Sequence, residues 1–183
     1  MLAQVPNILT LLRIAACPVL VILLNGQNYG AALLLFLVAG ITDGLDGYIA
    51  KRYNFVSKLG AILDPIADKL LIASTYIMLA ILQDIPFYLL IVVMFRDLVI
   101  VAGYLILVMM GENVPMRPLY TSKINTFLQI TLMIAVLMAK AHLLAFPMLV
   151  EILIVGVVIT TVVSGVQYVW SWGIRREYGE ESG

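Results

Sequence analysis

The segment DGLDGYIAKRYNFVSKLGAILDPIADKLL, residues 43–71, places four aspartates between two long apolar runs. They are Asp43, Asp46, Asp64 and Asp68, in a chain of 183 residues that is 63% hydrophobic and only 12% charged. A charged side chain deep in a membrane costs about 2.5–3.5 kcal/mol on an insertion scale. So many carboxylates in such a setting indicate a site that binds something positive.

The sequence on either side of this segment is that of an integral membrane protein. About 20 apolar residues of helix cross a hydrocarbon core of about 30 Å, and the mean hydropathy of the chain is +1.06. We therefore predict an all-α protein with six transmembrane helices in one bundle, forming a single domain over residues 1–183. The predicted spans are residues 7–24, 31–50, 59–82, 87–110, 124–139 and 146–172. The polar tail RREYGEESG after them is predicted to be frayed.

Two simple counts exclude other classes of protein. Cys17 is the only cysteine, so no intramolecular disulfide can form. The formal net charge is zero, which gives no basis for a nucleic-acid partner. His142, the only histidine, falls in a connection and is interpreted as a solvated loop residue.

The basic residues predict the orientation in the membrane, because cytosolic loops are enriched in Lys and Arg. Only Lys140 flanks an odd-numbered connection, whereas the even-numbered connections and the C-terminus are flanked by Lys51, Arg52, Lys58, Arg117, Lys123, Arg175 and Arg176. Both termini and the aspartate-rich segment are therefore predicted to be cytosolic. No transit peptide precedes the first span, which predicts a prokaryotic inner membrane.

The aspartate spacing predicts a metal site. Asp43 and Asp46 are three residues apart and Asp64 and Asp68 four apart, so each pair shares one helix face. If the two helices are antiparallel neighbours, the four carboxylates converge, and unit charges 4 Å apart repel by roughly 4 kcal/mol at an effective dielectric constant of 20. Hard oxygen ligands favour Mg²⁺ or Mn²⁺, and four carboxylates suffice for two ions.

Residues beside the aspartates suit a phosphate-bearing ligand. Gly47, Ala50 and Gly60 have little or no side chain where such a ligand would lie. Lys51 and the basic residues near it add positive charge at the rim of the site. The same basic residues also fit a simple topogenic role, and both interpretations stay open.

Together these residues resemble the CDP-alcohol phosphotransferase family, whose motif reads D-x-x-D-G-x-x-A-R-x8-G-x3-D-x3-D. Here the motif runs from Asp43 to Asp68, and every position matches except Lys51, which replaces the usual arginine. Lysine keeps the charge but lacks the two-pronged guanidinium, so the phosphate contact at this position is expected to differ. The similarity in span layout extends over nearly the whole chain.

The resemblance implies an activity and roles for the aspartates. It implies a six-helix protein, commonly a homodimer, that transfers the phosphatidyl group of CDP-diacylglycerol to an alcohol and releases CMP in phospholipid biosynthesis. Asp43, Asp46 and Asp64 are implied to be metal ligands. Asp68 is implied to be both a ligand and the general base that deprotonates the acceptor hydroxyl. The bound metals would neutralise the pyrophosphate and stabilise the leaving CMP.

The N-terminal stretch PNILTLLR is also similar to that of the family. Asn7, Thr10 and Arg13 are three residues apart, so they share a helix face that could turn toward the aspartates and the nucleotide. As an alternative, Asn7 and Thr10 cap a helix and Arg13 is an interfacial anchor.

The acceptor alcohol is predicted from the fourth and fifth spans. Family members that use glycerol 3-phosphate usually carry L-R-E and K-x-K-T there, whereas this chain has Tyr104 and Asn125 in place of two cations. The R-D pair and S-K-x-N-T-x-x-Q instead resemble the eukaryotic-type cardiolipin synthase branch, whose acceptor is phosphatidylglycerol. Glycerol 3-phosphate remains the alternative.

The candidates for acceptor binding are Arg96, Lys123 and Asn125. Arg96 and Asp97 are expected to point to different sides of their helix, which leaves Arg96 available for a phosphate. In the alternative interpretation, Arg96 is buried and paired with a neighbouring helix.

Two further classes of function fit the sequence less well. A cation or proton transporter would place its acids near the bilayer midplane and show broken helices or an internal repeat, and the sequence has neither pattern. A structural membrane subunit would tolerate Asn in place of the aspartates.

Overall fold

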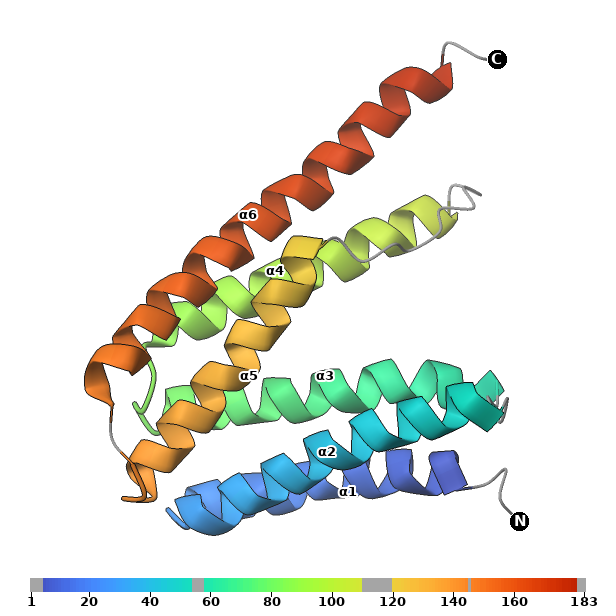
Figure 1. Ribbon diagram of the computed structural model, residues 1–183. Helices are drawn as coiled ribbons and strands as arrows, with labels where there is room; N and C mark the ends of the chain where they lie inside the picture. The colour runs from blue at the N-terminus through green and yellow to red at the C-terminus, as the bar shows by residue number, and fades with distance from the viewer. Residues whose placement is uncertain (1–4, 54–57, 110–119, 145, 181–183) are drawn as a thin grey trace. The chain divides into compact units, whose positions relative to one another are not determined.

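The computed structural model describes residues 5–53, 58–109, 120–144 and 146–180, and nearly all of them are helical (Figure 1). The description leaves out the side chains of residues 5–9, 45–53, 58–66, 104, 105, 107, 108, 169 and 171–180. All six predicted helices are present in the described chain. They are α1 (Val5–Asn25), α2 (Tyr29–Tyr53), α3 (Lys58–Ile81), α4 (Phe87–Met109), α5 (Tyr120–Lys140) and α6 (Pro147–Glu180).

Two helices are longer than their apolar runs. α5 begins at Tyr120 rather than at residue 124, so that Ser122 and Lys123 are helical. α6 continues to Glu180, so the prediction of a frayed tail from residue 175 is wrong for the backbone as far as that residue. Hydropathy marks the part of a helix that suits hydrocarbon, whereas the backbone hydrogen bonds continue through polar residues that have good helix propensity.

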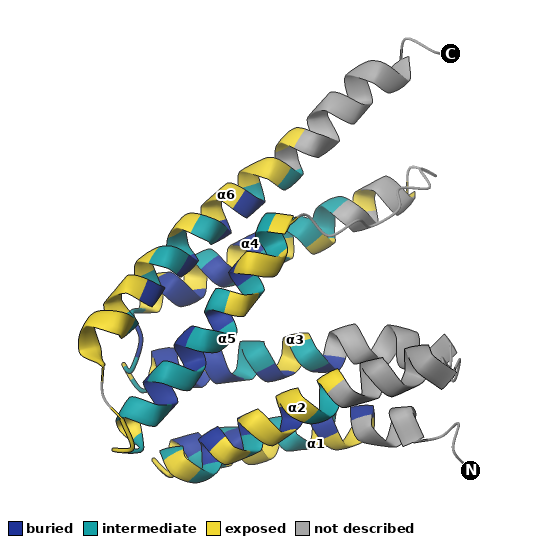
Figure 2. Ribbon diagram, viewed as in Figure 1, coloured by how far each residue is buried: buried dark blue, intermediate teal, exposed yellow. Residues whose placement is uncertain are grey.

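Among the described residues, two segments are long and apolar enough to cross a membrane. They are Tyr120–Lys140 and Pro147–Tyr168, with mean hydropathies of 1.5 and 2.4. α6 exposes large apolar side chains along much of its length, as Figure 2 shows in yellow; Ile152, Val155, Ile159 and Val162 are among them. Such a surface suits lipid better than water. The six-span topology and the cytosolic termini stay predictions.

The chain divides into two compact units. Unit 1 comprises Met1–Ile85 and Met133–Phe146, and unit 2 comprises Pro86–Leu132 and Pro147–Gly183. In unit 1, α2 and α3 both pack against α1. Leu20 and Leu24 of α1, Phe36 of α2, and Leu71 and Leu79 of α3 are buried. The two aspartate-bearing helices, α2 and α3, are therefore both packed against α1.

Unit 2 contains α4, the first part of α5, and α6. α4 packs against α6, and Leu89 and Val93 of α4 and Val157 of α6 are completely buried. α5 also approaches α6 closely, because a Cβ added to Gly156 would lie 3.7 Å from Leu128 Cδ1.

The same C-terminal turn ends α1, α3 and α5 in unit 1. Gln27, Gln83 and His142 have φ angles of 56°, 61° and 55°. In each turn the next residue donates its N–H to the carbonyl five residues earlier, as from Asp84 N to Leu79 O at 2.8 Å. This is the Schellman pattern, in which glycine normally takes the left-handed position.

An ion pair joins the turn after α3 to the last residue of α5. The Asp84 side chain is only 2% exposed and contacts Lys140 Nζ. Tyr29 donates its hydroxyl to Asp84 Oδ2 at 2.8 Å. The one basic residue that flanks an odd-numbered connection therefore has a local structural partner.

Replacing His142 by glycine should stabilise the protein. A left-handed conformation costs a non-glycine residue about 1–2 kcal/mol, and the His142 side chain is exposed. We expect His142→Gly to raise the Tm in detergent by about 2–4 °C, measured by thermal unfolding. Ala141→Gly is the matched control, since no positive φ is recorded at residue 141, and it should not raise the Tm. A lower Tm for His142→Gly would contradict the role assigned to this turn.

Two tyrosines of unit 1 should respond oppositely to loss of the hydroxyl. Tyr76 is completely buried, and its hydroxyl has no hydrogen-bond partner within the described part of the chain. A buried unsatisfied hydroxyl costs about 1–3 kcal/mol, so Tyr76→Phe should raise the Tm. Tyr29→Phe removes the bond to Asp84 and should lower it. Equal effects of the two changes in thermal unfolding would contradict this assignment.

Candidate active site

The buried face of α1 carries polar side chains. Thr10 is 1% exposed and Arg13 4% exposed, whereas Leu11 and Leu12, between them, are 57% and 59% exposed. The spacing of three residues therefore places Thr10 and Arg13 on one inward face, as the sequence predicted. Because Arg13 is buried, the alternative in which it is an interfacial anchor is wrong.

Arg13 bridges two of the four aspartates. Its Nη1 lies 2.9 Å from Asp43 Oδ1 of α2 and 3.4 Å from Asp68 Oδ1 of α3. The Arg13 side chain is 3% exposed, but those of Asp43 and Asp68 are 36% and 39% exposed. Aspartates from two helices thus converge on a third helix, with the positive charge buried beneath them and the carboxylates partly open to solvent.

The pair formed by Asp43 and Asp68 fits a divalent cation. Its carboxylate oxygens are hard ligands that already meet around a positive charge, and they remain accessible from outside. No group of three or more His, Cys, Asp or Glu side chains gathers within the described part of the chain. The fit therefore rests on these two aspartates.

The side chains of the other residues predicted to bind the metal, the nucleotide or the phosphates are outside the described part of the structure, except that of Thr10. Their backbone positions fall on α1, α2 and α3, the three helices that Arg13, Asp43 and Asp68 connect. These residues are Asn7, Asp46, Gly47, Ala50, Lys51, Gly60 and Asp64.

A second buried arginine lies in unit 2. Arg96 of α4 is 7% exposed. Its Nη2 donates to Ser122 Oγ of α5 at 2.6 Å and to Ser164 Oγ of α6 at 2.7 Å. The guanidinium carbon also lies 5.9 Å from the centre of the Tyr168 ring. Arg96 therefore links three helices, which matches the alternative of a buried structural arginine.

The prediction that Arg96 and Asp97 point to different sides is wrong. Arg96 Nη1 donates to Asp97 Oδ1 at 2.7 Å. Neighbouring Cβ atoms diverge on a helix, but the long arginine side chain can curl back to its neighbour's carboxylate, which the spacing rule does not consider.

The remaining acceptor candidates differ in accessibility. Asn125 is completely buried, and its Oδ1 accepts hydrogen bonds of 2.9 Å from both Thr160 and Thr161 of α6. Lys123, two residues earlier on α5, is exposed. Of the three candidates, Lys123 is the one open to a ligand.

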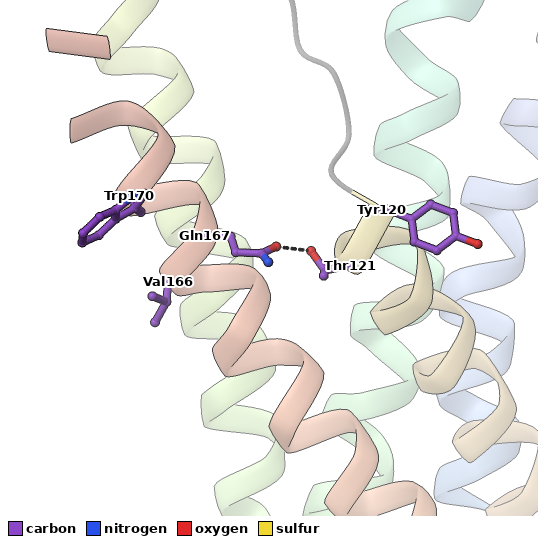
Figure 3. Close-up of a pocket in the computed structure, with 5 residues that line it drawn as sticks. All are labelled: Tyr120, Thr121, Val166, Gln167 and Trp170. Atoms are coloured by element: carbon purple, nitrogen blue, oxygen red, sulfur yellow. Dashed lines mark hydrogen bonds between the residues drawn. The ribbon is translucent and has the colours of Figure 1, made fainter. Parts of the chain in front are cut away.

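A groove lies between the start of α5 and the C-terminal half of α6 (Figure 3). Its volume is about 540 Å³, and Thr121 donates to Gln167 Oε1 across it at 2.6 Å. The exposed rings of Tyr120 and Trp170 and the exposed Val166 also line it. Tyr120 is the first residue of one candidate span and Trp170 follows the end of the other, where aromatic residues favour a membrane interface.

Sequence reasoning missed this groove. Its residues come from two helices and carry no motif, and only the aromatic residues beside the apolar runs could have indicated an interfacial position.

Comparison with known proteins identifies a family for this chain. The family model for CDP-alcohol phosphatidyltransferase matches residues 3–163. A CDP-diacylglycerol–glycerol-3-phosphate 3-phosphatidyltransferase of Rickettsia bellii is 36% identical over 170 residues, which cover 90% of this chain and 93% of that protein. The enzyme of the same name from Bacillus subtilis is 34% identical over 182 residues, with 90% and 93% covered.

A CMP-forming cardiolipin synthase of Rattus norvegicus is 33% identical over 180 residues, which cover 90% of this chain and 60% of that protein. The aligned regions in all three relatives include both the aspartate-bearing helices and most of the remaining chain. The chain thus belongs to the CDP-alcohol phosphatidyltransferase family.

Proposed function

We propose that this phosphatidyltransferase transfers the phosphatidyl group of CDP-diacylglycerol to phosphatidylglycerol, giving cardiolipin and CMP. The observation that carries the proposal is the convergence of Asp43 and Asp68 on Arg13, because it gathers the two ends of the aspartate motif at one accessible point. The family and its place in phospholipid biosynthesis follow from the sequence matches.

The proposed cofactor is Mg²⁺ or Mn²⁺, with two ions held by Asp43, Asp46, Asp64 and Asp68. A divalent ion there would supply charge neutralisation for the diphosphate and for the departing CMP. Asn7, Thr10, Gly47, Ala50, Lys51 and Gly60 are proposed to line the nucleotide and phosphate side, since they belong to the same three helices.

Asp68 is the proposed general base. Its carboxylate is 39% exposed, so an acceptor hydroxyl can approach it. The hydroxyl oxygen forms a bond to the phosphorus of the phosphatidyl group, the bond from that phosphorus to the CMP oxygen breaks, and Asp68 takes the hydroxyl proton.

The described acceptor side is poor in available cations, which supports a phosphodiester acceptor. Arg96 is bonded to Asp97, Ser122 and Ser164. Asn125 stands where the family resemblance implies a lysine in members that use glycerol 3-phosphate, and it is buried against α6. Lys123 remains for one acceptor phosphate. A single cation suits the one negative charge of a phosphodiester better than a dianionic phosphomonoester.

The groove between α5 and α6 also supports a lipid acceptor. Its lining combines the hydrogen-bonded Thr121 and Gln167 with aromatic and aliphatic residues, which suits a molecule that is polar at one end and apolar at the other. Lys123 lies on α5 close to the groove residues Tyr120 and Thr121.

Transfer to glycerol 3-phosphate, giving phosphatidylglycerophosphate and CMP, is the second candidate. It is favoured by the names of the Rickettsia bellii and Bacillus subtilis relatives. A cation or proton transporter is set aside, because relatives over 90% of the chain are named as phosphatidyltransferases.

The proposed setting is a prokaryotic inner membrane with the active site on the cytosolic side, and the proposed assembly is a homodimer. The pairing of Lys140 with Asp84 supports this orientation, because it gives a structural reason for the one basic residue on the opposite side.

The acceptor can be tested by measuring CMP release from CDP-diacylglycerol by the purified protein with Mn²⁺ or Mg²⁺. Phosphatidylglycerol and glycerol 3-phosphate are offered in separate reactions. We expect release with phosphatidylglycerol and none after chelation with EDTA. Asp68→Asn should lower the rate by at least about 100-fold, because it removes the base and a metal ligand.

Glu151→Gln is the matched control, because Glu151 is an exposed acid of α6 and should not affect the rate. Release with glycerol 3-phosphate alone would replace the first candidate by the second. Absence of release with both alcohols would contradict both candidates.

A further inference from the structure

The proposed transfer step assigns no role to Arg13, yet Arg13 is the most buried charge of the described aspartate site. Its side chain is 3% exposed, and it contacts carboxylates of two different helices through one nitrogen. Removing one partner from a buried ion pair is strongly destabilising, because it leaves a buried charge without compensation. The position of Arg13 therefore needs a reason beyond packing.

We propose that Arg13 is a built-in counter-ion that holds Asp43 and Asp68 together without a metal and weakens the affinity of the site for divalent cations. This inference rests on the proposed function, because it concerns the same metal site. It makes Arg13 a positioning residue, since it acts on the reacting groups through the two aspartates.

The geometry gives Arg13 the first of these effects. Asp43 and Asp68 belong to α2 and α3, and both helices pack against α1, which carries Arg13. Both carboxylates contact Nη1 of the same guanidinium, so its charge offsets their mutual repulsion. The pair can thus remain assembled while no metal is bound.

The weaker affinity for divalent cations follows from the different exposure of the carboxylates and the guanidinium. The carboxylates are about a third exposed, whereas the guanidinium beneath them is almost fully covered. A cation arriving from solvent can reach the carboxylates without displacing Arg13, and the two positive charges then repel one another. This repulsion lowers the affinity of the site, so a divalent cation can leave and be replaced while the two aspartates stay in place.

Packing of α2 and α3 on α1 should keep the two carboxylates near one another when Arg13 is replaced. α1 also packs against both helices where apolar side chains are buried, and the replacement of Arg13 leaves those side chains unchanged. Replacing Arg13 removes the repulsion between its charge and a bound cation, and this gain should outweigh any loss of order in the two carboxylates. We therefore expect the affinity for divalent cations to rise.

The test measures Tm by thermal unfolding of the full chain in detergent, with EDTA and along a Mn²⁺ titration. Arg13→Gln should lower the Tm in EDTA by roughly 5–15 °C. Mn²⁺ should recover more of the Tm than it adds to the wild type, with a half-saturating concentration about tenfold lower. Arg13→Lys keeps the charge and should restore the wild-type metal response.

Arg96→Gln is the matched control, because Arg96 is also buried but is bonded in unit 2 to Ser122, Ser164 and its own neighbour Asp97. It should lower the Tm without changing the Mn²⁺ concentration dependence. The inference is overturned if the Tm of Arg13→Gln depends on Mn²⁺ concentration in the same way as that of the wild type. If Arg13→Gln does not fold, Arg13→Lys decides, and a Mn²⁺ dependence of its Tm that differs from the wild type overturns the inference. If the wild type itself shows no metal response, the proposed metal site fails as well.

Discussion

The ion pairs of Arg13 are the constraint on which the described part of the site depends. A guanidinium buried in an apolar helix bundle must be compensated, and Asp43 of α2 and Asp68 of α3 both contribute to this compensation. The demand for compensation therefore fixes which faces of the two helices turn toward α1. The same demand gathers Asp43 and Asp68, the two ends of the motif, and their carboxylates remain partly exposed.

A buried arginine organises each of the two units, but its partners give it a different role. Arg13 joins α1 to two charged side chains that are partly exposed, so its site can accept a ligand. Arg96 joins α4 to Ser122 and Ser164, and its other partner, Asp97, is its own neighbour. Arg96 of unit 2 therefore links three helices. Its charge is already bonded within the protein, and Asn125 is neutral, so neither residue offers a cation to a phosphomonoester.

The sequence was sufficient for the six helices, for the shared face of Thr10 and Arg13 and for the convergence of Asp43 and Asp68, whereas the roles of the aspartates stay predictions. Apolar runs and helical spacing are local properties, and a long motif of fixed spacing is specific. The contact between Arg96 and Asp97 was not predictable from spacing, because it depends on the conformation of one long side chain. The burial of Asn125 against Thr160 and Thr161 and the groove beside Trp170 depend on how α5 meets α6, which no local pattern contains.

The central claim is that Asp43 and Asp68 are brought together to bind a divalent cation. It is tested most directly by Mn²⁺ electron paramagnetic resonance, which measures how much added Mn²⁺ the purified protein removes from solution. The account predicts that the wild type binds Mn²⁺, that Asp43→Asn binds at least about tenfold more weakly, and that Glu151→Gln binds like the wild type. Equal binding by Asp43→Asn and the wild type would contradict it.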